Sequence, residues 1–241
     1  MNRKSAILCV FLAVLCSPAC LQQQTGHTLY LSQDGAVTWT TMERDIHSDA
    51  RDPAERAREE QDFLNQLTAG THPMLTGLRS LDPSSSRVRF VRRERPYLVL
   101  TEARFDRADR MLQKLFDELR IPGTASLTRT ADQTTLSIAF EVPGQESESA
   151  DESPIAPLAD FDEPYRFVLT AGRFVSAAGF TLDSDGAVAA LDKEWMTERC
   201  KPGAMVTLSL TWIASAPSAE RPTFAPAETA GATAGRRAPN Y

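Results

Sequence analysis

The sequence contains one dense cluster of arginines, a residue type that can bind anionic ligands. Five guanidinium groups fall within nine residues, at Arg87, Arg89, Arg92, Arg93 and Arg95. A guanidinium group binds phosphate through paired hydrogen bonds, and each basic residue near an anionic lipid surface contributes about 1 kcal/mol. The pattern predicts a patch for an anionic ligand. Two other interpretations stay open: the arginines face solvent beside Glu94, Glu102 and Asp106, or they bind the chain's own acidic segment.

The other candidates for chemistry are weaker. Asp45, His47 and Asp49 would share one strand face and could offer oxygen and imidazole to a metal, but a polar strand end explains them better. Residues 183–186 (DSDG) resemble the start of a calcium loop without its later oxygen ligands, so a hairpin turn is the better interpretation. No catalytic motif accompanies the three histidines. We expect no enzyme activity, no cofactor and no metal site.

The charge balance of the chain bears on its partners. The formal net charge is −6, and the mature chain is more acidic still, at −8, because Arg3 and Lys4 belong to the leader described next. Phosphate backbones require a net basic surface or a dense basic stripe. We therefore expect no nucleic acid among the partners.

Residues 1–19 have the three parts of a secretory signal peptide. Arg3 and Lys4 supply the positive start, residues 6–16 are apolar, and Ser17 and Ala19 are the small residues before the cleavage point. The apolar stretch is about half the roughly 20 residues that a membrane-spanning helix needs. The sequence predicts export from the cytoplasm.

Cys20 follows this signal directly, in a context (SPAC) that resembles the lipobox of bacterial lipoproteins. Lipidation there would anchor the chain to a membrane of the cell envelope, with residues 20–26 as a polar tether. Leu21, in place of Asp, would favour the outer membrane if the cell has one. The alternative is ordinary cleavage after Ala19, which yields a secreted or periplasmic protein. Cys200 is a lone thiol if Cys20 is acylated, and if Cys20 is not acylated the two cysteines could form one disulfide.

Hydrophobic periodicity divides the rest of the chain into strands and helices. Strands are expected at 27–32, 36–46, 87–93, 97–105, 125–130, 134–142, 165–170, 173–182, 187–191 and 206–212. Helices are expected at 53–69, capped by Asp52 and ended by Gly70, at 73–81, and at 107–120, capped by Asp106. Leu115 and Phe116 lie in the middle of the apolar face of that third helix, and we expect both to be buried.

The order of these elements predicts the fold class. Hairpins throughout and no βαβ alternation indicate an α+β domain, with an antiparallel sheet built from hairpins and two main helices packed on it. Residues 27–213 form this single domain. The acidic loop 143–164 interrupts it with seven carboxylates and no basic residue, and 214–241 is an Ala/Pro-rich tail that we expect to be disordered.

Three segments together resemble the LppM-type domain of bacterial envelope lipoproteins. They are a hairpin after the anchor cysteine (LYLSQDGAVTWT), a strand–helix–hairpin run (YLVLTEARFDRADRMLQKLF, then LTRTADQTTLSIAF), and a final strand and hairpin (YRFVLTAGRFVSAAGFTLDSDGAVAAL). Gly172, Val175, Ala178 and Gly179 stand where the family has G-x-V-x-x-A/T-x-G. The resemblance implies a barrel-like sheet with packed helices at the membrane surface, and binding of lipid or glycolipid.

These observations lead to two functional hypotheses. The first is an exported, non-enzymatic envelope lipoprotein that binds lipid, glycolipid or another envelope protein. The second is a secreted structural or protein-interaction module with no small ligand. An apolar pocket between helix 107–120 and the sheet would favour the first, whereas a filled core there would favour the second.

Overall fold

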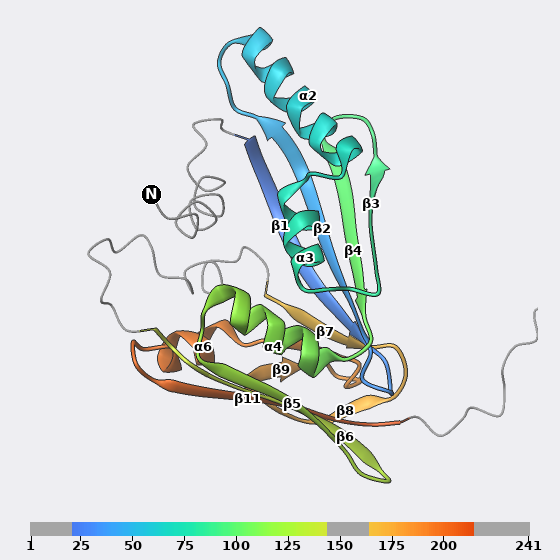
Figure 1. Cartoon of the computed structure of the whole chain (residues 1–241), viewed down its shortest axis with the longest axis vertical. Coiled ribbons are helices and arrows are strands. Elements are labelled where there is room, and N and C mark those ends of the chain that lie inside the picture. The colour runs from blue at the N-terminus through green and yellow to red at the C-terminus, as the bar shows by residue number, and fades with distance from the viewer. Residues whose placement is uncertain (1–20, 144–163, 215–241) are drawn as a thin grey trace, which may run out of the picture.

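The computed structural model describes residues 21–143 and 164–214 (Figure 1). The signal peptide, Cys20, most of the acidic loop and nearly all of the Ala/Pro-rich tail lie outside the described residues. The elements are β1 (Leu21–Leu31), β2 (Val37–Ser48), α2 (Pro53–Ala69), α3 (Pro73–Ser80), β3 (Ser85–Arg92), β4 (Tyr97–Phe105), α4 (Ala108–Leu119), β5 (Gly123–Arg129), β6 (Gln133–Glu141), β7 (Arg166–Leu169), β8 (Arg173–Ala178), β9 (Phe180–Leu182), β10 (Val188–Leu191), α6 (Lys193–Arg199) and β11 (Met205–Ile213).

The expected α+β class is confirmed, but the strands form two sheets instead of one. The larger has the order β3-β4-β2-β1-β7-β10-β9 and the smaller β5-β6-β11-β8, and they do not close into a barrel. One pair departs from the antiparallel expectation, because β1 and β7 run parallel. Parallel neighbours need a long connection, and here everything from β2 to β6 lies between them in the chain.

The first hairpin is confirmed and is longer than expected. Gly35 in its turn has φ of 80°, a conformation that glycine adopts without strain. Residues 21–26, expected as a tether, belong to strand β1 and pair with β2 as far as Leu21 opposite Ser48. A side-chain hydrogen bond of 3.1 Å from Arg44 to Gln24 adds to the backbone pairing. The polar residues of this segment are thus part of the sheet.

Local capping explains where the helices begin and end. The Asp52 side chain accepts a hydrogen bond of 3.0 Å from the Ala54 backbone, and Gly70 ends α2 in the left-handed conformation, as predicted. Helix α4 starts one residue later than expected, because Arg107 has extended backbone angles and takes the cap position. Among the described helices, none combines the length and the apolar character that a membrane crossing needs.

The segment expected as one strand over 173–182 is two strands in different sheets. Gly179, with φ of 81°, separates β8 in the smaller sheet from β9 in the larger one. The short helix α6 was not predicted; Asp192 caps it by accepting a hydrogen bond of 2.9 Å from the Trp195 backbone. It is too short and too polar to show apolar periodicity.

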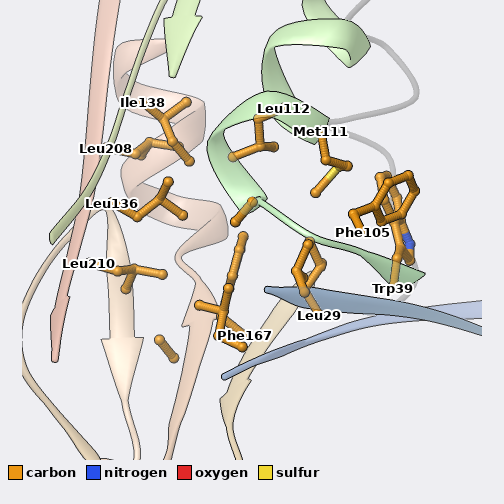
Figure 2. Close-up of a cluster of buried hydrophobic side chains, with 14 of the residues drawn as sticks. Leu29, Trp39, Phe105, Met111, Leu112, Leu136, Ile138, Phe167, Leu208 and Leu210 are labelled. Atoms are coloured by element: carbon orange, nitrogen blue, oxygen red, sulfur yellow. The ribbon is translucent and has the colours of Figure 1, made fainter. Parts of the chain in front are cut away.

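The main core lies between α4 and the inner faces of the two sheets (Figure 2). Met111, Leu112 and Phe116 of α4 are buried there, whereas Leu115 is only partly buried, contrary to the expectation. A smaller cluster of Ile46, Phe63, Leu67 and Val99 lies under α2. The interior beneath α4 is therefore filled by side chains.

Candidate functional site

The larger sheet has one face covered by helices and one face open in the described residues. Strand β4 shows the difference: alternate residues from Val99 to Phe105 are buried, whereas those from Leu98 to Arg104 are half-buried or exposed. Helices α2 and α3 pack on the buried side of β2, β3 and β4 (Figure 1). The other side is a sheet surface that no described helix covers.

The centre of this open face is apolar. Met42 of β2 lies opposite Leu100 of β4 and is 37% exposed. Leu98 is the next outward residue on β4, and neither leucine belongs to a core cluster. On the other side of Met42 the register places Gly26, which has no side chain to cover it. Three large apolar side chains therefore meet solvent together.

Basic residues surround this apolar centre. The strand registers place Arg44 beside Leu98, Arg89 beside Leu100 and Arg87 beside Glu102. Arg104 and Arg166 occupy outward positions further along β4 and on β7. We call this surface the arginine face and define it by Met42, Leu98, Leu100, Arg44, Arg87, Arg89, Arg104 and Arg166.

Glu102 is the acidic residue that the strand registers place among these side chains. Its carboxylate lies 2.7 Å from Arg87 Nε and 3.8 Å from Arg89 Nε, so both arginines have the counter-charge that the solvent-facing interpretation anticipated. Their side chains remain 69% and 59% exposed, and ion pairs at such positions contribute little to stability. One carboxylate cannot neutralise two guanidinium groups, so the arginine face keeps a positive charge.

The structure divides the predicted arginine patch. Arg87 and Arg89 lie on the arginine face, and the register places Arg92 opposite Leu98 at its edge, whereas Arg93 and Arg95 lie in the turn between β3 and β4. Arg92 donates to the Pro96 carbonyl, and Arg93 lies 5.6 Å from the centre of the Phe90 ring. Arg95 forms an ion pair of 2.5 Å with Glu60, a buried residue of α2. These three have structural partners of their own.

Sequence reasoning did not place Arg44, Arg166 or the three apolar side chains on the arginine face. Arg44 and Arg166 are far from the dense arginine run in the chain, and the pairing of β2 with β4 and of β1 with β7 brings them to this surface. The one signal in the sequence was that both arginines stand at outward positions in the alternation of predicted strands. Their grouping depends on long-range register, which alternation does not give.

The outer face of the smaller sheet provides an internal comparison. Its paired rows are hydroxyl side chains: Ser126, Ser137 and Ser209 in one row, and Thr128, Thr135 and Thr211 in the next. Threonine suits a solvated strand, and Thr135 and Thr211 lie 3.0 Å apart between their oxygens. The middle of this face therefore carries hydroxyl groups, whereas the middle of the open face of the larger sheet carries Met42, Leu98 and Leu100; Met205 is exposed at the start of β11.

The structure does not assemble the candidate metal ligands. Asp45 has φ of 54° at an irregularity of β2, His47 Nδ1 lies 2.6 Å from the Asp45 carbonyl, and Asp49 accepts a hydrogen bond from Gln22. Within the described residues no three His, Cys, Asp or Glu side chains are grouped as metal ligands. Asp183 accepts a hydrogen bond of 3.0 Å from the Val188 backbone in a hairpin turn, as the preferred interpretation of that motif predicted.

Two surface hollows of about 420 and 430 Å³ occur on the described residues. The first lies on α6 and is lined by Lys193, Glu194, Thr197 and Glu198. The second lies at the start of α2 and is lined by Asp52, Ala54, Glu55 and Arg58. Both are open and lined largely by charged side chains, and neither is under α4. The arginine face remains the surface with the clearest chemical character.

Comparisons with known proteins find one weak likeness. No protein-family model and no curated protein matches the chain in sequence. In structure, the chain is similar to the folded domain of the Mycobacterium tuberculosis LppM protein, solved by NMR, with a TM-score of 0.36 and 11% sequence identity. The match covers 83% of this chain and 93% of that domain. The likeness to an LppM domain is therefore a weak one, at the level of the fold.

Proposed function

We propose that this chain is an exported, non-enzymatic lipoprotein of the bacterial cell envelope. A lipid on Cys20 holds it to the membrane, which is the outer membrane if the cell has one. The arginine face then binds the anionic headgroups of lipid or glycolipid. In this proposal the ligand lies on the sheet surface, because the space beneath α4 is filled by side chains.

The observation that carries the proposal is the composition of the arginine face. Five arginines surround Met42, Leu98 and Leu100, with Glu102 as their acidic neighbour. Guanidinium groups bind phosphate oxygens, while the apolar centre suits the boundary between headgroups and acyl chains. The chain as a whole is acidic, yet these basic groups lie on one of its surfaces. Two copies of the arginine face would repel each other, so the face favours an anionic partner over the same face of a second chain.

The position of Cys20 gives separate support. Strand β1 begins at Leu21, so the attached lipid would lie one residue, or about 3.8 Å along the chain, from the larger sheet. Strand β1 pairs directly with β2, which carries Met42 and Arg44 of the arginine face. An anchor at this point would keep the face close to the bilayer.

The filled interior beneath α4 also favours the second candidate, a secreted structural or protein-interaction module with no small ligand. In that case the arginine face would dock on an acidic protein surface. Binding to protein-free vesicles separates the two candidates, because only the first requires it.

The lipid anchor can be tested by metabolic labelling with a palmitate analogue. The wild-type chain should be labelled, and Cys20→Ser should not be, because the thiol is the acylation site in the proposal. A Cys200→Ser chain serves as the matched control and should label like the wild type. Equal labelling of wild type and Cys20→Ser would contradict the lipoprotein assignment.

The arginine face can be tested with soluble protein that lacks residues 1–20. It should bind vesicles containing anionic lipid but not neutral ones, and binding should weaken with salt because screening shortens to about 8 Å at physiological ionic strength. At about 1 kcal/mol per arginine, replacing both Arg87 and Arg89 with serine should lower the affinity about 30-fold, as a vesicle co-sedimentation assay would measure.

The control for that experiment removes the same charge elsewhere. Arg110 on α4 and Arg173 on β8 are exposed and lie off the arginine face, so their double serine variant should bind nearly as well as the wild type. Equal losses in the two double variants would mean that net charge alone decides binding. Absence of binding to anionic vesicles would leave the second candidate function.

A further inference from the structure

A buried polar band crosses the covered face of the larger sheet. Thr41 of β2 is fully buried and lies opposite His27 of β1 on one side and Thr101 of β4 on the other. Glu43 is the next inward residue of β2 and is 1% exposed. His72, on the turn from α2 to α3, closes over it at 4% exposure. The band includes a carboxyl and two imidazoles.

The contact between Glu43 and His72 is isolated from solvent. Glu43 Oε1 lies 3.5 Å from His72 Nε2, and the Phe63 ring stands edge-on to the imidazole with ring centres 5.2 Å apart. Glu43 Oε2, His72 Nδ1 and Thr101 Oγ1 have no hydrogen-bond partner in the structure. A buried charge without partners is costly, so this contact favours neutral groups on both sides.

The ionisation of the pair follows from its burial. Desolvation raises the pKa of Glu43 from 4.5 to about 7, against a side-chain hydrogen bond with Gln23 that lowers it. Desolvation lowers the pKa of His72 from 6.5 to about 4. Between about pH 4.5 and 6.5 the docked pair therefore holds one proton, on the carboxyl. The same two groups in water would also hold one proton in this range, but on the imidazole.

The other ionisable groups near the contact have partners of their own. They are Glu59 with Ser48, Glu60 and Tyr97 with Arg95, Arg79 with Gly70 and Ser86, and His27 with Thr41. His27 also stacks on Tyr165, with ring centres 4.6 Å apart. Opening of α2 also breaks the contacts of Glu59 with Ser48 and of Glu60 with Arg95, and it does so equally in the wild type and in the variants tested below.

Helix α2 is held on the sheet by a small, separate apolar cluster, together with the contacts of Glu59 with Ser48 and of Glu60 with Arg95. Phe63 and Leu67 of α2 pack on Ile46 and Val99, and these four buried residues are not continuous with the main core. Local opening requires loss of only those contacts that join the opening segment to the rest. Helix α2 with its following turn can therefore open at lower cost than the whole domain.

We propose that Glu43 and His72 form a one-proton latch, which holds α2 on the sheet with a strength that stays constant across mildly acidic pH. On opening, Glu43 releases its proton to water and His72 takes one up, so the number of bound protons does not change. By linkage, an equilibrium without net proton exchange is independent of pH. This inference does not depend on the proposed lipid binding or location, and it concerns how the fold stays closed as the pH changes.

Single substitutions should reveal the two opposing halves of the latch. In Glu43→Gln only His72 titrates: opening takes up a proton, so the opening equilibrium should rise roughly tenfold for each pH unit of acidification between 6.5 and 4.5. In His72→Gln only Glu43 titrates: opening releases a proton, so the equilibrium should rise by a similar factor for each unit of increasing pH. In the wild type the opening equilibrium should change less than about threefold between pH 4.5 and 6.5.

The measurement is amide hydrogen exchange of residues 57–69 in the full chain at several pH values, corrected for the intrinsic exchange rate. Asp62→Asn, exposed on α2, and His47→Gln, exposed on β2, are the matched controls and should follow the wild type. Thermal unfolding monitored by circular dichroism identifies any variant that fails to fold. If His72→Gln fails, His72→Asn provides the second form of the same test. The latch would be overturned if the opening equilibrium of the wild type depended on pH as steeply as that of either variant. It would also be overturned if the opening equilibrium of both variants were independent of pH.

Discussion

Replacing Phe116 with alanine should lower the free energy of unfolding by about 3–5 kcal/mol. The side chain is 6% exposed in the last turn of α4, and its ring centre lies 6.0 Å from that of Phe140 on β6. A side chain at Gly123 would also meet it, since a Cβ there would be 3.0 Å from the Phe116 ring. The surrounding strands cannot close the space that the ring leaves, so a cavity adds to the lost burial. Urea-induced unfolding of the full chain measures the effect.

Two other substitutions on the same helix calibrate this result. Glu118→Ala removes an exposed side chain, and it should change stability by no more than about 0.5 kcal/mol. Leu115→Ala should fall between the two, because Leu115 is only partly buried. A Phe116→Ala variant as stable as Glu118→Ala would show that α4 is peripheral to the core.

Leu115 also shows how far helical periodicity can predict burial. The apolar face of α4 is wider than the strip that contacts the sheets, so the sequence marks a face but not the centre of the contact. The structure places Met111, Leu112 and Phe116 at that centre and leaves Leu115 at its margin. Helix spacing is a local property, whereas the direction from which the sheets approach depends on the whole fold.

Strand alternation was the more reliable signal. Val206, Leu208, Leu210 and Trp212 of β11 alternate in the sequence, and all four are buried. The bounds of β4 were also predicted correctly, because Pro96 precedes it and Asp106 follows it. Period-two alternation reports directly which side of a strand meets a core.

The division into two sheets could not be predicted from these local patterns. Strand β7 pairs with β1, and β8 pairs with β11, so neighbours in space are far apart in the chain. The composition of the arginine face depends on the same long-range pairings. Residues 21–26 were misassigned for a related reason: they are polar, yet backbone pairing with β2 is enough to make them a strand.

Gly179 stands where the chain passes from the smaller sheet to the larger one, and Gly179→Ala should destabilise the domain by about 2–5 kcal/mol. Its φ of 81° is unfavourable for alanine by about 1–2 kcal/mol. A Cβ there would also lie 2.2 Å from Leu208 Cδ2 and 3.1 Å from the Trp195 ring. Leu208 is 6% exposed on β11, so its side chain has little room to move, and overpacking of this kind costs about 1–3 kcal/mol more.

Gly203→Ala separates these two contributions. Gly203 has a similar φ of 75°, but a Cβ there would meet nothing within 4 Å, so its variant should show the backbone cost alone, about 1–2 kcal/mol. The difference in unfolding free energy between the two variants, measured by chemical denaturation, is then the cost of forcing a methyl group against Leu208 and Trp195. Equal losses would mean that these side chains move aside freely, and the crossing between the sheets would be held by backbone conformation rather than by close packing.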